Sequence, residues 1–298
     1  MEGYVPDTEN RNPATMGIDE GGILDMLRMI NEQDMEVPRA VGRALGEIAL
    51  VVERAEKVIR GGGRVVYIGA GTSGRLGVLD ASECPPTYGV SADLFVGVIA
   101  GGEDALVRSS EGKEDCGELG VRDLKGIGFS ARDMLIGLAA SGRTPYVIGA
   151  LEYARALGAA TACVVCSKAS PMEAVSSIAV VVDVGPEVVT GSTRMKSGTA
   201  QKLVLNMIST GTMIRFGKVY GNLMVDVRPT NSKLLARAKR IIMEVTGCTQ
   251  DEAGQTLQAS GDSVKTAIVM LKKHLPPEEA AKLLAQSEGR LKQALGEA

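Results

Sequence analysis

Residues 64–75 read Arg64-Val65-Val66-Tyr67-Ile68-Gly69-Ala70-Gly71-Thr72-Ser73-Gly74-Arg75, an apolar run followed by a glycine-rich loop. Such continuous hydrophobicity is typical of a strand that is buried on both faces of a parallel sheet. The loop matches G-x-G-x-x-G, a pattern that in dinucleotide-binding proteins joins a strand to the helix behind it. We therefore predict a strand over 64–68, a tight turn and a helix from Ser73.

Four more apolar runs follow, and helical stretches separate them. The predicted strands are 64–68, 94–100, 134–139, 161–166 and 178–184, and the predicted helices between them are 73–82, 103–120, 145–157 and 171–176. This alternation predicts a doubly wound α/β fold whose five-stranded sheet is mostly parallel.

Helices are also predicted before and after the alternating region. Residues 18–60 carry apolar side chains at helical spacing, and Gly61-Gly62-Gly63 ends that stretch. A long helix is predicted over 193–214, and shorter ones over 236–245, after a cap at Thr249, over 263–273 and over 277–295. We expect residues 1–230 to form the main domain, with N-terminal helices and a core at about 55–220, and residues 231–298 to form a small helical C-terminal module.

The composition argues against several classes of protein. The 298 residues are 45% hydrophobic and carry a net charge of −3, so a sizeable core can form but no basic surface for a nucleic acid is available. Residues 1–20 are polar and acidic, unlike a signal peptide, and no apolar run is long enough to cross a membrane. We expect a cytoplasmic protein with neither a nucleic-acid nor a membrane partner.

Cysteine and histidine usage does not indicate a metal centre. The five cysteines, Cys84, Cys116, Cys163, Cys166 and Cys248, are scattered and do not predict a disulfide framework. Cys163 and Cys166 lie three apart in a predicted strand, so their sulfurs face opposite sides. The one histidine, His274, lies in the predicted C-terminal helices and is expected at the surface. We expect neither a metal ion nor a cofactor.

The same tripeptide follows two of the predicted strands. Ser73-Gly74-Arg75 follows the first strand and Ser141-Gly142-Arg143 follows the third. The carboxyl ends of parallel strands are where ligands bind, and hydroxyls and N–H groups at helix N-termini suit an anion. We predict that a phosphate is bound by Thr72, Ser73, Gly74, Ser141, Arg143 and Thr144. The alternative is that these serines only cap helices.

A dinucleotide does not fit the first loop as well. It would require an acidic residue at the end of the second strand, about 20 residues further on, to hold the ribose. That strand ends in Val98-Ile99-Ala100-Gly101-Gly102, and Glu103 lies beyond it. A small phosphorylated substrate is therefore the better prediction.

Candidate acid–base groups lie in two segments. Glu83 precedes Cys84-Pro85-Pro86, where the first helix is predicted to end. Glu111, Glu114 and Asp115 lie in a charged segment, and composition does not choose among them.

The loop at 185–199 is long and polar and opens the predicted helix at 193–214. One interpretation is that Lys196 and the Ser and Thr hydroxyls complete a polar pocket. The other is that Ser192 and Thr193 are only N-terminal caps.

Long motifs in the chain resemble one known family. They are Arg11-Asn12-Pro13, Tyr67 to Thr87, Ala140 to Val147, Thr190 to Arg194 and Lys218 to Val227. Over nearly its whole length the sequence resembles the N-acetylmuramic acid 6-phosphate etherase family, part of the sugar-isomerase (SIS) superfamily. The resemblance implies a flavodoxin-like SIS fold, a homodimer with the active site near its interface, and a ubiquitin-associated-like module at 247–275.

The resemblance also implies an activity. The family cleaves the D-lactyl ether of N-acetylmuramic acid 6-phosphate during cell-wall recycling, giving N-acetylglucosamine 6-phosphate and D-lactate without a metal. The match places the two catalytic glutamates on Glu83 and Glu114. In the expected reaction the C2 proton is removed, lactate leaves C3 and water adds. We expect Glu83 to protonate the leaving oxygen and Glu114 to handle the C2 proton, with the reverse assignment as the main alternative.

Two other classes would use the same loops. An aldose–ketose sugar-phosphate isomerase would need the phosphate site and one carboxylate base. A non-catalytic sugar-phosphate sensor, such as the glucokinase regulator of the same superfamily, would bind its ligand unchanged. The presence of both Glu83 and Glu114 argues against the sensor.

Overall fold

The computed structural model describes residues 6–108, 112–227, 229 and 231–297. The chain forms two compact units. The first consists of Met1–Ser82 and Ala92–Ser209, and the second of Glu83–Ser91 and Thr210–Ala298.

A parallel sheet lies at the centre of the first unit. Its strands are β1 (Val65–Gly69), β2 (Phe95–Ile99), β3 (Met134–Leu138), β4 (Ala160–Val165) and β5 (Ile178–Val181), in the spatial order β2-β1-β3-β4-β5. Val65 pairs with Phe95 on one side and with Met134 on the other, and every ladder is parallel. The predicted doubly wound α/β fold is confirmed. β5 ends at Val181, three residues before its predicted end at Val184.

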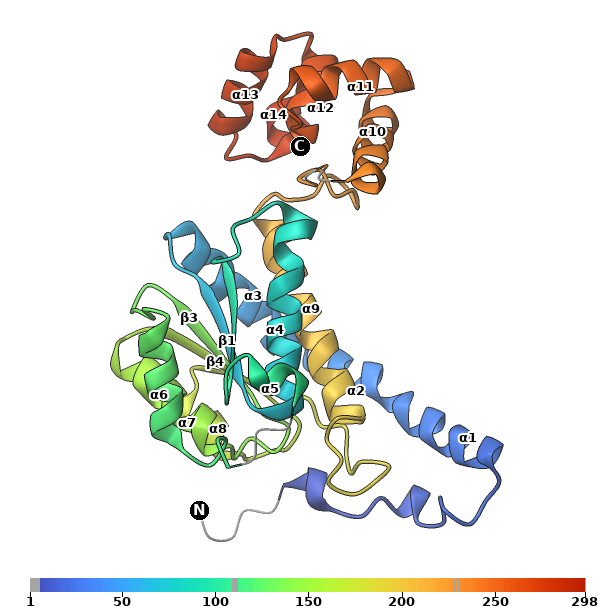
Figure 1. The fold of residues 1–298 in the computed structure, drawn as a ribbon, viewed down its shortest axis with the longest axis vertical. Helices are drawn as coiled ribbons and strands as arrows, with labels where there is room; N and C mark the ends of the chain where they lie inside the picture. Colours follow the sequence, from blue (N-terminus) through green and yellow to red (C-terminus); the bar gives the residue numbers. More distant parts are fainter. Residues whose placement is uncertain (1–5, 109–111, 228, 230, 298) are drawn as a thin grey trace. The chain divides into compact units, whose positions relative to one another are not determined.

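Helices cover both faces of this sheet (Figure 1). α6 (Gly117–Gly126), α7 (Pro145–Ala156) and α8 (Pro171–Val175) lie on one face, and α3 (Leu45–Arg60), α4 (Gly71–Tyr88) and α9 (Lys196–Arg215) on the other. The buried cluster between the strands and α7 includes Ile68, Leu135, Tyr146 and Leu151. Burying both faces accounts for the continuous apolar runs in the sequence.

Two helix predictions for the region around the sheet are wrong. The single helix expected over 103–120 is replaced by α5 (Asp104–Val107) and by turns at residues 112–115 before α6. Residues 109–111, including Glu111, lie outside the described residues. α4 was predicted to end at Glu83 but continues through Pro85 and Pro86 to Tyr88. A proline removes one helical hydrogen bond, and here both prolines lie in the last turn, where Gly89 N still donates to the Pro85 carbonyl over 2.9 Å.

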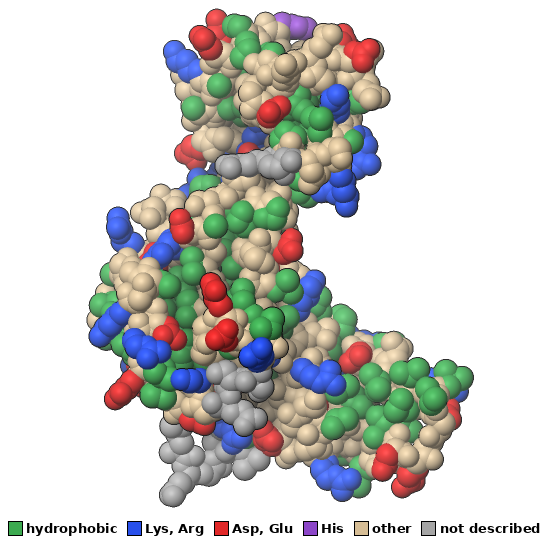
Figure 2. Space-filling model, viewed as in Figure 1, with side chains coloured by type: hydrophobic (Ala, Val, Ile, Leu, Met, Phe, Trp, Pro, Cys, Tyr) green, Lys and Arg blue, Asp and Glu red, His purple; other side chains and the backbone are tan. Residues whose placement is uncertain are grey.

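The N-terminal region adds two further helices, α1 (Ile23–Asp34) and α2 (Glu36–Arg43), after short 3₁₀ turns at Asp7–Glu9 and Pro13–Thr15. No residue of α1 is buried. Its apolar side chains Ile23, Leu24 and Leu27 are 77%, 59% and 51% exposed. Figure 2 shows hydrophobic side chains gathered over this helix.

The second unit is helical at its C-terminal end. It contains α10 (Ser232–Thr246), α11 (Gln250–Ala259), α12 (Val264–Lys273), α13 (Pro277–Gln286) and α14 (Leu291–Leu295). Thr249 and Glu252 form the predicted capping box of α11. The single helix predicted over 277–295 is wrong, because Glu288 and Gly289 adopt positive φ angles of 53° and 73° and separate α13 from α14. Two predictions about single side chains are confirmed. Cys163 and Cys166 are buried in the first unit, and His274 is exposed in the second.

Candidate active site

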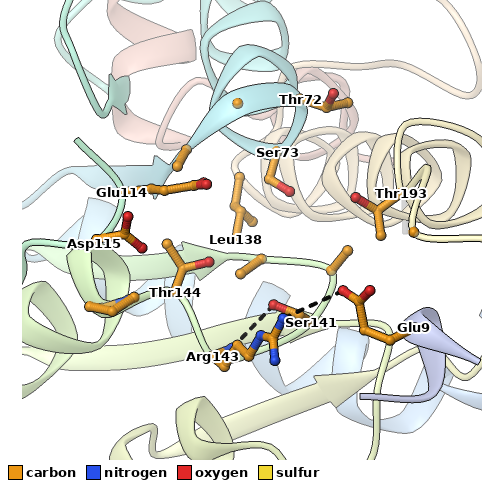
Figure 3. Close-up of a pocket in the computed structure, with 16 residues that line it drawn as sticks. Glu9, Thr72, Ser73, Glu114, Asp115, Leu138, Ser141, Arg143, Thr144 and Thr193 are labelled. Atoms are coloured by element: carbon orange, nitrogen blue, oxygen red, sulfur yellow. Dashed lines mark hydrogen bonds and ion pairs between the residues drawn. The ribbon is translucent and has the colours of Figure 1, made fainter. Parts of the chain in front are cut away.

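A polar pocket of about 490 Å³ lies at the carboxyl ends of β1 and β3 in the first unit (Figure 3). Six of its lining residues were predicted site residues: Thr72, Ser73, Glu114, Ser141, Arg143 and Thr144. The parallel sheet brings these segments together, because successive strands end at the same edge.

The first wall of the pocket is the start of α4. Gly71 has φ +52°, which favours glycine, and leads directly into Thr72 and Ser73. The Ser73 hydroxyl donates to Oε1 of Gln201 over 2.8 Å. The first N–H groups of a helix lack partners within it, so this end of α4 is suited to an anion.

Gly74 has a different environment from its neighbours. It does not appear among the pocket-lining residues, and its N–H donates to the Ala70 carbonyl over 3.1 Å. A Cβ there would lie 2.7 Å from the Gly69 carbonyl oxygen, so Gly74 allows α4 to pack closely on β1. Arg75 donates to the carbonyls of Leu106 and Arg108.

The second wall is the loop from β3 to α7. Gly142 has φ +65°, and a Cβ there would lie 2.4 Å from the Cβ of Ser170. The Ser141 hydroxyl accepts a hydrogen bond from the Arg143 N–H over 3.4 Å. Pro145 is the first residue of α7, where its missing N–H costs nothing.

Glu114 reaches the pocket from the segment before α6. Its main-chain carbonyl accepts from the Tyr146 N–H over 3.0 Å, which holds this residue beside the start of α7. Its side chain is exposed, and Figure 3 shows its carboxylate extending toward the middle of the pocket, with Asp115 beside it. The structure therefore brings Glu114 to the predicted phosphate loops.

Glu83 lies on α4, eleven positions after Thr72, and is exposed. A helix rises 1.5 Å per residue, so about 16 Å of helix separates the two residues. Glu83 is not one of the described residues that line the pocket.

Glu9 was not predicted as a site residue. It lines the pocket, and its carboxylate lies 3.5 Å from the Arg143 guanidinium (Figure 3). Its segment is anchored by Asn12, which donates to Gln33 and to the Pro186 carbonyl over 2.8 and 3.2 Å. No local pattern in the sequence signals a contact between residues so far apart.

The loop at 185–199 follows neither earlier interpretation fully. Thr193 and Gly191 line the pocket, but the buried Lys196 ammonium donates instead to the Val184 carbonyl over 2.8 Å. Burial lowers the pKa of Lys196, although the charge of Glu187 opposes that shift. The first N–H groups of α9 are capped by Glu187, whose two carboxylate oxygens accept from Lys196 N and Ser197 N, each over 2.9 Å.

The chemistry of this pocket follows from its groups. It combines five hydroxyl side chains, one guanidinium and two helix N-termini, which suit an anionic group, with the carboxylates of Glu9, Glu114 and Asp115. Within the described ranges, no cluster of three or more His, Cys, Asp or Glu residues is arranged to hold a metal ion. In the same ranges, no helix is long and apolar enough to cross a membrane.

Comparison with known proteins finds close relatives. The chain is 55% identical over 286 residues to an N-acetylmuramic acid 6-phosphate etherase of Aeromonas hydrophila, covering 96% of each chain. It is 53% identical over 290 residues to an enzyme of the same name from Clostridium botulinum, covering 97% of this chain and 96% of the other.

Domain models and solved structures agree on the fold. Residues 47–155 match the N-terminal SIS domain of glucokinase regulatory protein, 129–210 match the SIS domain, and 221–260 match the C-terminal lid domain of glucokinase regulatory protein. A phosphoheptose isomerase from Francisella tularensis superposes with a TM-score of 0.50 at 15% identity, covering 65% of this chain and all of that one. At that identity the likeness concerns the fold alone.

Proposed function

The chain belongs to the N-acetylmuramic acid 6-phosphate etherase family, and we propose that its polar pocket is where it cleaves the D-lactyl ether of N-acetylmuramic acid 6-phosphate. The products are N-acetylglucosamine 6-phosphate and D-lactate, and the reaction serves amino-sugar recycling from the cell wall. The observation that carries the activity is the 55% identity to an etherase across 96% of both chains.

The phosphate group binds at the two helix N-termini of the pocket. Thr72 and Ser73 contribute from α4, and Ser141, Arg143 and Thr144 contribute from the loop before α7. Gly74 was expected to join them, but its N–H already has a backbone acceptor, so we assign it to packing of the loop. With the phosphate there, the remaining sugar atoms extend toward Glu114.

The chemistry is an elimination followed by an addition. Opening of the sugar ring exposes the C1 aldehyde, which acidifies the C2 proton. A carboxylate removes that proton, the C3–O bond breaks, and the lactate oxygen takes a proton from an acid. Water then adds at C3 and C2 is reprotonated. Glu114 is assigned to the C2 proton and Glu83 to the lactate oxygen and the water, with the reverse assignment as the alternative.

The active enzyme is a homodimer in which Glu83 of one protomer completes the pocket of the other. Two observations support this assembly. Glu83 is exposed and about 16 Å along α4 from Thr72. α1 presents an exposed apolar face, as interfaces between copies do.

A cytoplasmic location is part of the same proposal. The five cysteines are all free, and three of them are buried. Free thiols persist in reducing compartments, which is where a pathway of phosphorylated sugars operates.

The test uses N-acetylmuramic acid 6-phosphate in ¹⁸O-labelled water. We expect D-lactate without label and N-acetylglucosamine 6-phosphate labelled at C3. Label in the lactate would mean that the C3–O bond survives and would exclude the elimination. Turnover of fructose 6-phosphate without lactate release would identify an isomerase instead.

Exchange of the C2 proton with solvent separates the two glutamates. We expect Glu114→Ala to abolish this exchange in added N-acetylglucosamine 6-phosphate, the product, and Glu83→Ala to retain it. The opposite pattern would reverse the two roles.

A further inference from the structure

The Ser73 hydroxyl lies between the pocket and the buried side chain of Gln201. Ser73 lines the pocket, and its Oγ donates over 2.8 Å to Oε1 of Gln201 on α9. Gln201 is 1% exposed, so water does not compete for this bond. A serine hydroxyl has one hydrogen, and Gln201 takes it in this arrangement. Only lone pairs of Ser73 remain for a ligand.

That arrangement does not suit a phosphate, which accepts hydrogen bonds and is repelled by lone pairs. The Gln201 amide also has an unmet need of its own. Its Nε2 has no hydrogen-bond partner among the residues that the structure describes. A buried amide donor without an acceptor is costly. A half-turn of the amide exchanges its oxygen and nitrogen, and brings Nε2 to the Ser73 oxygen.

The turned amide would also find a donor for its oxygen. Ser197 lies four residues before Gln201 on α9, and positions four apart share one face of a helix. The Ser197 side chain is fully buried, and within the described residues its Oγ has no hydrogen-bond partner other than the neighbouring Cys166 thiol. Its hydroxyl can donate to Oε1 of Gln201 once that oxygen faces it.

We propose that Gln201 is a positioning residue for phosphate recognition, an inference that rests on the proposed function. In this role the Gln201 amide is oriented with Nε2 toward the Ser73 oxygen, to which it donates a hydrogen bond. The Ser73 hydroxyl is then free to donate its hydrogen to a phosphate oxygen. Gln201 touches neither the substrate nor the reacting atoms and acts only through Ser73.

A double-mutant cycle tests this coupling. We expect Gln201→Met to raise the KM for N-acetylmuramic acid 6-phosphate about tenfold and to leave kcat within about twofold, because the effect is on binding. Ser73→Ala should raise KM to a similar extent, and the double variant should be no worse than Ser73→Ala alone. Calorimetric binding of N-acetylglucosamine 6-phosphate gives the same comparison without turnover.

The variant Gln201→Glu gives a readout that a merely structural residue would not. An ionised carboxylate accepts the Ser73 proton and donates nothing, so KM relative to wild type should rise about a hundredfold at pH 8. The KM of this variant should fall toward the wild-type value near pH 5, because the protonated carboxyl can donate a hydrogen bond to Ser73. Gln255→Glu, an exposed position on α11, is the matched control and should keep the wild-type KM at every pH.

Each result has a distinct consequence. Increases in KM that multiply in the double variant, or a Gln201→Glu effect independent of pH, would overturn the role of Gln201 and leave Ser73 in the phosphate site. An unchanged KM in Ser73→Ala would overturn the phosphate site itself. Absence of lactate from the wild-type enzyme would overturn the proposed function. If Gln201→Met does not fold, the pH dependence of Gln201→Glu decides alone.

Discussion

At the scale of single residues, Gly142 shows how closely the loop between β3 and α7, the proposed phosphate site, is packed. Its φ of +65° strains any other residue, and a Cβ would lie 2.4 Å from the Cβ of Ser170. We expect Gly142→Ala to raise KM for the sugar phosphate at least about tenfold, because the loop must move, and to destabilise the fold by about 1–3 kcal/mol. Steady-state kinetics and urea unfolding measure both effects.

Gly102→Ala is the control for this prediction. Gly102 has a similar φ of +70°, but a Cβ there meets nothing within 4 Å. It therefore carries the backbone strain without the collision and should leave KM unchanged. Equal KM values for the two variants would show that position 142 is not shaping the phosphate site.

Asp133 provides a prediction about pH. It is 4% exposed and accepts from Arg64 N and Ser130 N, each over 3.0 Å, and from the Arg64 guanidinium over 3.1 Å. Burial raises the pKa of Asp133, but the hydrogen bonds from Arg64 and Ser130 outweigh it, so the pKa lies below its ordinary 3.8. The ionised group therefore stabilises the fold above pH 3.8, and this contribution is lost as the pH falls through the lower, folded-state pKa.

We expect Asp133→Asn to lose about 2 kcal/mol of unfolding free energy at pH 7. The difference in unfolding free energy between this variant and the wild type should shrink below pH 3.8, where the carboxyl is protonated in the unfolded state. Urea unfolding at pH 7 and pH 3 measures it, with Asp19→Asn, an exposed carboxyl, as the control. A difference that stayed constant with pH would mean that the charge of Asp133 is not responsible.

The sequence allows some of these site residues to be predicted and not others. Thr72, Ser73, Ser141 and Thr144 directly follow strands, so their meeting at one sheet edge follows from the parallel order. Gln201 meets Ser73 across 128 positions, and such pairing depends on how α9 packs. The tripeptide repeat also does not reveal that Gly74 packs α4 against β1.

At the scale of elements, the start of α9 depends on one buried carboxylate. Each oxygen of Glu187 accepts a different N–H, from Lys196 and from Ser197. In Glu187→Gln only one of these bonds survives, because the amide nitrogen faces the other donor. We expect a loss of about 2 kcal/mol in unfolding free energy, which is the largest loss usually seen when a helix N-cap is removed.

The capping box of α11 provides the matched control for Glu187. Both Thr249 groups donate to the same oxygen of Glu252, so the amide of Glu252→Gln can keep both bonds. We expect that variant to lose only about 0.5 kcal/mol, chiefly from the helix dipole. Equal losses at the two positions in urea unfolding would contradict this account.

Elements differ in how well local sequence predicts them. The strands are recognisable because each is an unbroken apolar run between polar loops, and α7 because Pro145 starts it. The continuation of α4 past Pro85 could not be predicted, since the usual effect of proline is to end a helix and nothing local signals otherwise. The separation of α5 from α6 is equally hidden, because charged residues suit helix and loop alike.

At the scale of the whole molecule, the α1 face provides a test of assembly. Leu24 and Leu27 are more than half exposed on a helix with no buried residue. We expect the double variant Leu24→Lys with Leu27→Lys to sediment as a monomer, because charges cannot be buried in an apolar interface. Glu32→Lys, a charge change at an exposed polar position of α1, should remain a dimer. A dimeric double variant would show that α1 is not part of the interface.

The last prediction asks whether one active site uses both protomers. Glu83→Ala and Glu114→Ala should each be inactive alone. If Glu83 acts in the pocket of its partner, a mixed dimer of the two variants has one pocket with both glutamates and one with neither. Random mixing makes about half of all dimers mixed, so coexpression should restore about a quarter of wild-type lactate release. If Glu83 instead serves the pocket of its own chain, every pocket lacks one glutamate and mixing restores nothing.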